Sequence, residues 1–311
     1  MSRQTARVRE VGPRDGLQMV SSILSTEHKL EWCRAAAKAG IEEIEVTSFV
    51  PPSLIPQFAD AREVALGAVA MGGFRAAALV PNLKGAERAI AAGLPVVNYV
   101  LSASEAHNLA NVRRSSDESL KGFGDIVALR DAAPGAKTIL GGCVATAFGC
   151  TIQGDVPERR VIEIAGRYAE MGADEIVIAD TVGYAAPLQV RRIMSAVVKE
   201  VFPLPVACHF HDTRGLGLAN VTAAVEAGVR AFDASIGGLG GCPFAPGASG
   251  NIDTEDTVFL LEQLGLATGV DIEALVALRA RVAEWLPGEN LGGAIARAGL
   301  PKTFRSNAAH D

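Results

Sequence analysis

The stretch Glu170-Met171-Gly172-Ala173-Asp174-Glu175-Ile176-Val177-Ile178 decides the fold that this sequence predicts. Its first part is typical of the end of a helix, because a glycine at that position accepts the left-handed backbone without a steric penalty. Its second part is rich in β-branched residues and predicts a strand. The same order of helix, glycine, short loop and strand recurs at residues 36–47, 91–100 and 226–233. The chain is therefore expected to alternate between helices and strands.

Extending this pattern along the chain predicts eight strands, near residues 7–12, 43–48, 75–80, 96–102, 138–144, 175–180, 205–211 and 231–236. Helices are expected between them, near residues 26–39, 55–71, 83–92, 116–131, 157–171, 187–200 and 215–227. Such an order implies parallel strands joined by right-handed crossovers, and eight units predict a closed (β/α)8 TIM barrel. The alternative is an open doubly wound sheet, which is disfavoured because no GxGxxG motif follows the first strand.

The last part of the chain is expected to be helical, with helices near residues 255–266 and 272–285. We interpret residues 254–311 as the last helix of the barrel followed by a short C-terminal helical extension. Residues 1–311 then form a single catalytic barrel domain, although 311 residues alone would also allow two domains.

Composition excludes several classes of protein. Hydrophobic residues make up 49% of the chain and charged residues 21%, which excludes a disordered or low-complexity protein. The formal net charge of −6 argues against a nucleic-acid partner. No apolar run approaches the ~18 residues that span a bilayer, so no membrane partner is expected. No targeting motif is recognisable at either end, and five cysteines without a CxxC pair disfavour a disulfide framework, so we expect a cytoplasmic protein.

Polar residues gather where the predicted strands end, which is the end of a TIM barrel that carries function. His209 and His211 are two residues apart on a strand, so both side chains point to one face, which is the barrel interior if their neighbours face the helices. With Asp15, and an oxygen of Asn251, they predict a site for Mg²⁺ or Mn²⁺ rather than Zn²⁺. The alternative is a pair of hydrogen-bonded histidines at the barrel mouth. No role is assigned to the remaining histidines, His28, His107 and His310.

Charged residues and one cysteine lie beside this predicted site. Arg14 follows the first strand in a turn rich in glycine and proline, where a guanidinium can stabilise developing negative charge, although a surface ion pair with its neighbour is the alternative. Glu45 is costly to bury alone, so it either pairs with Arg14 or joins proton transfer. Asp180 ends an apolar strand and is either catalytic or an outer hydrogen-bonding group. Cys242 lies in a glycine-rich segment and either transfers a proton there or is incidental.

Taken together, these residues make the sequence resemble the hydroxymethylglutaryl-CoA lyase family, which belongs to the DRE-TIM metallolyase superfamily. The resemblance extends from about Val8 to the late 280s. Its motifs are EVGPRDGLQ at residues 10–18, EVTSFV at 45–50, PNLKG at 81–85, HFHDT at 209–213 and the cysteine segment at 237–251.

The resemblance implies a (β/α)8 barrel that binds one divalent cation and an acyl-CoA, and that forms a homodimer. It implies that the metal ligands are Asp15, His209, His211 and Asn251. It implies that the catalytic residues are Arg14, Glu45, Asp180, Cys242 and Glu255. It places five residues near substrate or coenzyme A: Gln18, Ser48, Asn82, Lys84 and Asn111. Arg214, which departs from the family pattern, is a further substrate-side candidate.

The activity implied by the resemblance is cleavage of 3-hydroxy-3-methylglutaryl-CoA to acetyl-CoA and acetoacetate, as in leucine breakdown. Arg214 and Leu216 stand where the lyases usually carry tyrosine and glutamine, so a related substrate such as citramalyl-CoA is the alternative. A Claisen-condensing acyltransferase is a second alternative, but such enzymes commonly carry a further region that 311 residues barely allow. A barrel that binds metal or coenzyme A without catalysis has no positive support in the sequence.

Overall fold

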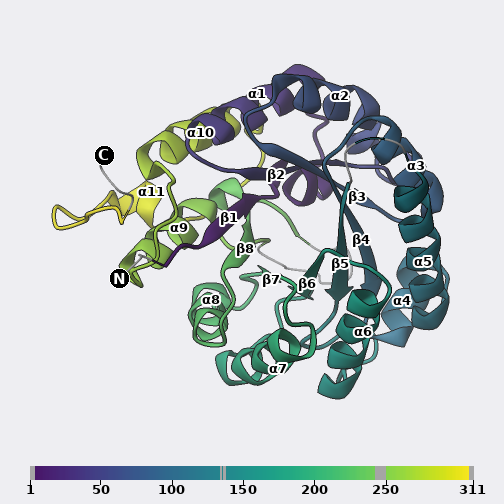
Figure 1. Cartoon of the computed structure of the whole chain (residues 1–311). Helices are drawn as coiled ribbons and strands as arrows, with labels where there is room; N and C mark the ends of the chain where they lie inside the picture. Colours follow the sequence, from purple (N-terminus) through teal and green to yellow (C-terminus); the bar gives the residue numbers. More distant parts are fainter. Residues whose placement is uncertain (1–3, 134, 136–137, 242–249, 308–311) are drawn as a thin grey trace.

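Eight parallel strands close into a barrel, with each strand paired to the next in the chain and the last paired to the first (Figure 1). The computed structural model describes residues 4–133, 135, 138–241 and 250–307. The strands are β1 (Arg7–Glu10), β2 (Glu43–Ser48), β3 (Arg75–Val80), β4 (Val96–Ser102), β5 (Ile139–Ala145), β6 (Glu175–Asp180), β7 (Val206–Phe210) and β8 (Ala231–Ala234). Every strand bound lies within two residues of its predicted range, and the TIM barrel is confirmed.

Helices form a ring outside the strands (Figure 1). They are α1 (Thr26–Lys38), α2 (Ala61–Met71), α3 (Leu83–Ala91), α4 (Glu105–Val112), α5 (Ser116–Ala132), α6 (Glu158–Glu170), α7 (Pro187–Glu200) and α8 (Gly217–Glu226). Gly172 follows α6 at φ 102° and Gly228 follows α8 at φ 99°, so both adopt the left-handed backbone on which the prediction depended.

Two helices differ from the prediction. The helix expected from residue 55 begins at Ala61, because the chain first forms a separate 3-10 turn at Pro56–Phe58. The short helix α4 was not predicted. It begins after Ser104, whose side chain accepts a hydrogen bond from the backbone N–H of His107.

The two faces of the strands have different environments. Outward residues such as Cys208 and Phe210 are fully buried in the apolar layer between strands and helices. Inside the barrel, the apolar cluster consists of Val177, Ala207 and Ala231, with Cys143 packed against it. TIM barrels usually fill this space with branched apolar side chains. In this chain much of the interior is occupied instead by charged and polar side chains.

Among the described residues after β8, the chain forms three α-helices. The helix α9 (Thr254–Gln263) packs against α8 and β1, and α10 (Ile272–Trp285) packs against α1 and α9. The short helix α11 (Ile295–Ala298) contacts α9. The first two are the helices expected near residues 255–266 and 272–285. Within the described residues, no helix combines the length and the apolar character that crossing a bilayer requires.

Candidate functional site

Side-chain atoms of Asp15, His209 and His211 converge inside the C-terminal end of the barrel, and all three residues are buried. The Nε2 atoms of the two histidines lie 3.1 Å apart. Oδ2 of Asp15 lies 3.9 Å from Nε2 of His209 and 3.5 Å from Nε2 of His211. Neighbouring ligands of an octahedral Mg²⁺ are roughly 3 Å apart, so these separations suit one shared divalent cation.

Local backbone structure explains this convergence. After β1 the chain makes a tight π-helical turn, Gly12–Gly16, with a proline in its first positions and every residue buried. The turn holds Arg14 and Asp15 over the end of the barrel. His209 lies on β7 and His211 follows its last residue, and the alternation of the strand directs both imidazoles inward, as the sequence predicted.

Asn251 completes the cluster from the other side. It pairs with His211 through an isolated β-bridge. Its Nδ2 donates to Oδ2 of Asp15 at 2.9 Å and to the carbonyl oxygen of Leu239 at 3.0 Å. Within the described part of the chain, neither Oδ1 of Asn251 nor Nδ1 of His211 has a hydrogen-bond partner, although both atoms are buried. Two imidazoles, a carboxylate and an unsatisfied amide oxygen form a donor set that fits Mg²⁺ or Mn²⁺.

The charges around the cluster keep its carboxylate ionised. Burial raises the pKa of Asp15, but the Arg14 guanidinium and the two histidines outweigh this effect and hold the pKa well below its usual range. Burial lowers the pKa of His209, but its hydrogen bond to Asp233 and the charge of Asp15 outweigh burial and raise it above the ordinary value. Asp15 therefore offers an ionised carboxylate as a ligand for a cation.

Arg14 joins the metal cluster to a second carboxylate. Its guanidinium donates from Nη1 to Asp15 and from Nε to Glu45, and the side chains of Arg14 and Glu45 are 10% and 6% exposed. The other oxygen of Glu45 accepts a hydrogen bond of 3.0 Å from Nδ2 of Asn98. The pairing of Glu45 with Arg14, one of the two sequence interpretations, is therefore present. It fixes the guanidinium plane beside the predicted metal ligands.

A cavity of about 640 Å³ opens above these groups. Arg14, Asp15, Glu45 and both histidines of the cluster line it at the barrel end. Three of the predicted substrate-side residues also line it: Gln18, Asn82 and Asn111. Asn82 also caps α3, where its Oδ1 accepts from the N–H of Gly85 at 3.0 Å.

Other predicted site residues lie away from this lining. Ser48 is fully buried and donates to the carbonyl oxygen of Leu79 at 3.1 Å, while Lys84 is exposed on α3. Arg214 donates to the carbonyl oxygens of Val182 and Gly183, at 3.2 and 3.0 Å, and its guanidinium lies 4.5 Å from the ring centre of Tyr184. Ser48 and Arg214 therefore contribute to local structure around the barrel, whereas Lys84 points to solvent.

Two predicted catalytic carboxylates are engaged with backbone groups. Asp180 accepts from the N–H groups of Tyr184 and Ala185, at 2.8 and 3.1 Å, and burial raises its pKa. Glu255 is fully buried on α9 and accepts from the N–H of Gly237 at 3.2 Å. Neither residue lines the cavity. Cys242 lies outside the described residues.

Several cavity-lining residues were missed by sequence reasoning. Asn98 and Asp233 lie on the inward faces of β4 and β8, and His107, Arg113 and Arg114 lie in or just after α4. The inward pair carries a signal in the sequence, because each is a polar residue inside an apolar strand, like Glu45. The residues near α4 carry no such signal, since that helix was itself not predicted.

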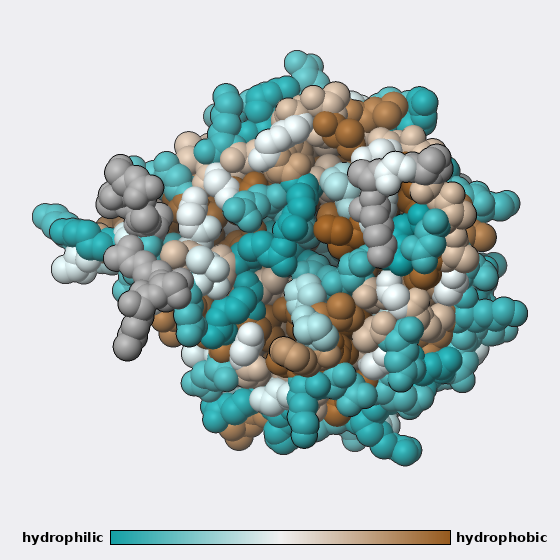
Figure 2. Space-filling model, in the orientation of Figure 1, coloured by the Kyte–Doolittle hydropathy of each residue, from teal (hydrophilic) through white to brown (hydrophobic). Residues whose placement is uncertain are grey.

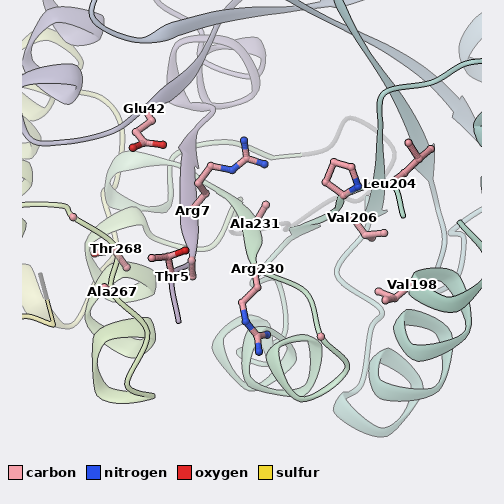
Figure 3. Close-up of a pocket in the computed structure, with 14 residues that line it drawn as sticks. Thr5, Arg7, Glu42, Val198, Leu204, Val206, Arg230, Ala231, Ala267 and Thr268 are labelled. Carbon is pink, nitrogen blue, oxygen red and sulfur yellow. The ribbon is translucent and has the colours of Figure 1, made fainter. Parts of the chain in front are cut away.

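A second cavity, of about 660 Å³, lies at the N-terminal ends of β1, β7 and β8 (Figure 3). Arg7, Arg230 and Glu42 bring charge to its lining. Arg7 pairs with Glu175 at 3.0 Å, and Arg230 donates to backbone carbonyls, so these cations are already neutralised or satisfied. Figure 2 shows hydrophilic residues gathered near the middle of the face seen in Figure 1. This cavity has no cluster of catalytic groups among the described residues that line it.

Comparison with known proteins gives a consistent result. The chain matches the HMGL-like family over residues 6–282, from just before β1 into α10. It is 40% identical to the hydroxymethylglutaryl-CoA lyase of Bacillus subtilis over 288 residues, covering 91% of this chain and 95% of that one. It is 42% identical to the mitochondrial hydroxymethylglutaryl-CoA lyase of Homo sapiens over 270 residues, covering 87% and 82%. A solved HMG-CoA lyase from Acinetobacter baumannii, in complex with coenzyme A and 3-methylmalate, matches with a TM-score of 0.90 and 44% identity, covering 97% of each chain.

Proposed function

The chain belongs to the HMGL-like family, and on this premise we propose that it cleaves 3-hydroxy-3-methylglutaryl-CoA to acetyl-CoA and acetoacetate. The observation that carries the proposal is the convergence of Asp15, His209 and His211 in the lining of the 640 Å³ cavity, beside the guanidinium of Arg14. A carbon–carbon lyase needs a group that activates a hydroxyl and a group that stabilises negative charge, and both are supported at this position.

The cation is proposed to be Mg²⁺ or Mn²⁺, held by Asp15, His209, His211 and Asn251. A cation held by these residues would supply Lewis-acid chemistry, lowering the pKa of the substrate's 3-hydroxyl group. Arg14, which pairs with Asp15, is proposed to stabilise the substrate oxygen that gains negative charge as the carbon–carbon bond breaks. Glu45 has both oxygens engaged, by Arg14 and Asn98, so we assign it to holding Arg14 in place rather than to proton removal.

The remaining predicted residues receive narrower roles. Asp180 and Glu255 are proposed to position the backbone of the loops that follow β6 and β8, because their oxygens accept from backbone N–H groups. Cys242 is proposed to protonate the enolate that leaves as acetyl-CoA. The cavity also reaches Asn111, Arg113 and Arg114 near the end of α4, and guanidinium groups there suit the phosphates of coenzyme A.

We also propose that residues 1–311 form one catalytic unit and that the protein acts as a cytoplasmic homodimer. The four described cysteines, Cys33, Cys143, Cys150 and Cys208, are free thiols, which suits a reducing compartment. Size-exclusion chromatography with light scattering tests this proposal. A dimer should give twice the chain mass of 32.3 kDa.

The activity is tested with a panel of 3-hydroxydicarboxyl-CoA thioesters, supplied with Mg²⁺ or Mn²⁺, by comparing kcat/KM for release of acetyl-CoA. We expect the highest value with 3-hydroxy-3-methylglutaryl-CoA and loss of activity in His211→Ala and Cys242→Ala. The matched controls are His28→Ala and Cys150→Ala, which remove the same side chains away from the cavity. A steep preference for citramalyl-CoA, or full activity in both site variants, would contradict the proposal.

A further inference from the structure

We propose that Asp233, itself held by Arg9, is a positioning residue that fixes the ring of His209 with Nε2 directed at the metal cluster. This inference rests on the proposed metal site and concerns how the barrel prepares it. The three residues occupy one level of the barrel on three adjacent strands, because Asp233 on β8 is in register with His209 on β7 and with Arg9 on β1. Their side chains therefore point inward side by side.

The contacts among these residues are close and buried. Oδ2 of Asp233 lies 3.2 Å from Nδ1 of His209, and Oδ1 of Asp233 accepts from Nε of Arg9 at 2.5 Å. The side chains of Arg9, His209 and Asp233 are 3%, 9% and 10% exposed. Each oxygen of the carboxylate thus has its own partner, so the carboxylate cannot rotate away from the histidine without losing a charged hydrogen bond.

The choice of partner decides which nitrogen of His209 carries the proton. A neutral imidazole has one N–H and one lone pair, and a carboxylate at Nδ1 keeps the proton there. The lone pair of Nε2 is then free for a cation. Without the carboxylate, Nε2 can carry the proton and donate it to Nε2 of His211, only 3.1 Å away. In that arrangement His209 is the donor of the histidine pair and has no lone pair on Nε2 for a cation.

Arg9 is in turn fixed by further carboxylates. Its Nη1 donates to Oε2 of Glu175 at 2.5 Å and lies 3.5 Å from Oε1 of Glu43. Glu43 also pairs with Arg75 at 3.0 Å. Glu175 offers a matched control, because it is as buried as Asp233 and contacts Arg9 at the same distance, yet no contact joins it to His209 among the described residues.

The test compares Asp233→Asn with Glu175→Gln. In Asp233→Asn the amide oxygen faces Arg9, which donates only, so the amide N–H₂ faces His209 and favours the wrong tautomer. We expect the Kd for Mn²⁺, measured by calorimetry on the metal-free protein, to rise by about 10- to 100-fold in Asp233→Asn. Glu175→Gln should stay within about twofold of the unsubstituted protein, with thermal melts recorded for both variants.

A second measurement reads the tautomer in the unsubstituted protein and uses a variant only to assign the signal. Long-range ¹H–¹⁵N spectra of the unsubstituted, metal-free protein at pH 8 report the tautomer of each histidine, and the signal of His209 is identified by its loss in His209→Gln. A proton on Nδ1 is expected, and a proton on Nε2 would overturn the inference. So would an unchanged Kd in Asp233→Asn, or an equal loss in Glu175→Gln. If the unsubstituted protein binds no Mn²⁺, the proposed metal site fails together with this inference, whereas the other outcomes leave the metal site standing.

Discussion

Replacing Arg14 by methionine separates the structural part of this residue from its proposed chemical part. The substitution keeps most of the side-chain volume but removes the guanidinium that pairs with Asp15 and Glu45. Both carboxylates then remain buried without that partner. Removing one member of a buried ion pair typically lowers the free energy of unfolding by about 3–5 kcal/mol. This range applies here because the side chains of Arg14 and Glu45 are both buried.

This cost converts into a melting temperature. Unfolding entropy near the midpoint is roughly 2.1 cal/mol/K per residue, or about 0.65 kcal/mol/K for a chain of 311 residues. The Tm of Arg14→Met should therefore fall by about 5–8 °C. Adding Glu45→Gln removes the unpaired charge while leaving an acceptor for Asn98, so the double variant should regain about 1–3 kcal/mol.

Activity should not follow stability in this pair of variants. Loss of one group that stabilises a developing oxyanion costs about 10²–10³ in kcat, and the second substitution does not restore such a group. The assay is acetyl-CoA release at 25 °C with saturating Mn²⁺, beside calorimetric melts of Arg14→Met, Glu45→Gln and the double variant. If kcat recovers together with Tm in the double variant, Arg14 acts only as a structural partner of Glu45 and the reasoning is wrong.

Three further predictions follow from other parts of the barrel. Burial raises the pKa of Glu10 from its ordinary 4.5 to about 7. Between these two pH values the folded protein keeps a proton on Glu10 that the unfolded chain releases, so the free energy of unfolding should fall by about 3 kcal/mol as the pH rises from 4.5 to 7. Urea unfolding at pH 5 and pH 8 should show this loss in the unsubstituted protein and not in Glu10→Gln, and equal pH slopes would refute it. A Cβ on Gly142 would lie 2.6 Å from the ring of buried Tyr168, so Gly142→Ala should cost about 1–3 kcal/mol in unfolding free energy, whereas Gly288→Ala, with open space around it, should cost little. Chelation should abolish activity, and Mn²⁺ at about 100 times its Kd should restore activity and stabilise the fold by about 2.7 kcal/mol, a shift that should be absent in His211→Ala.

The fold was predictable because its signals are local. A helix that stops at glycine and a β-branched strand each depend on a few neighbouring residues, and the repetition of the pattern specified the barrel. The helix α4 escaped prediction because it has only eight residues and its main signal, the cap at Ser104, stands between polar residues typical of a loop. Short helices depend on tertiary contacts more than on propensity.

The candidate site was predictable where its residues lie close in sequence. Strand alternation alone put His209 and His211 on one face, and their short separation in the structure follows from that. The contact between His209 and Asp233 joins residues 24 positions apart, and that between Arg9 and Asp233 joins residues 224 apart. Such contacts depend on the register between strands, which no local pattern specifies. The sequence therefore predicted the groups that we propose as cation ligands, while the contacts proposed to orient them are seen only in the assembled barrel.

The charged interior gives one physical reason for a cation at this position. In the part of the chain that the structure describes, the inward side chains joined by these ion pairs comprise four guanidinium groups and five carboxylates: Arg7, Arg9, Arg14, Arg75, Asp15, Glu43, Glu45, Glu175 and Asp233. With neutral histidines, this set carries one net negative charge in a largely buried volume, which is costly to maintain. The divalent cation that we propose there would change the net charge to plus one, and the free carboxylate of the proposed substrate would then neutralise it. The same ion pairs that replace an apolar core thus favour a cation first and an anionic substrate second.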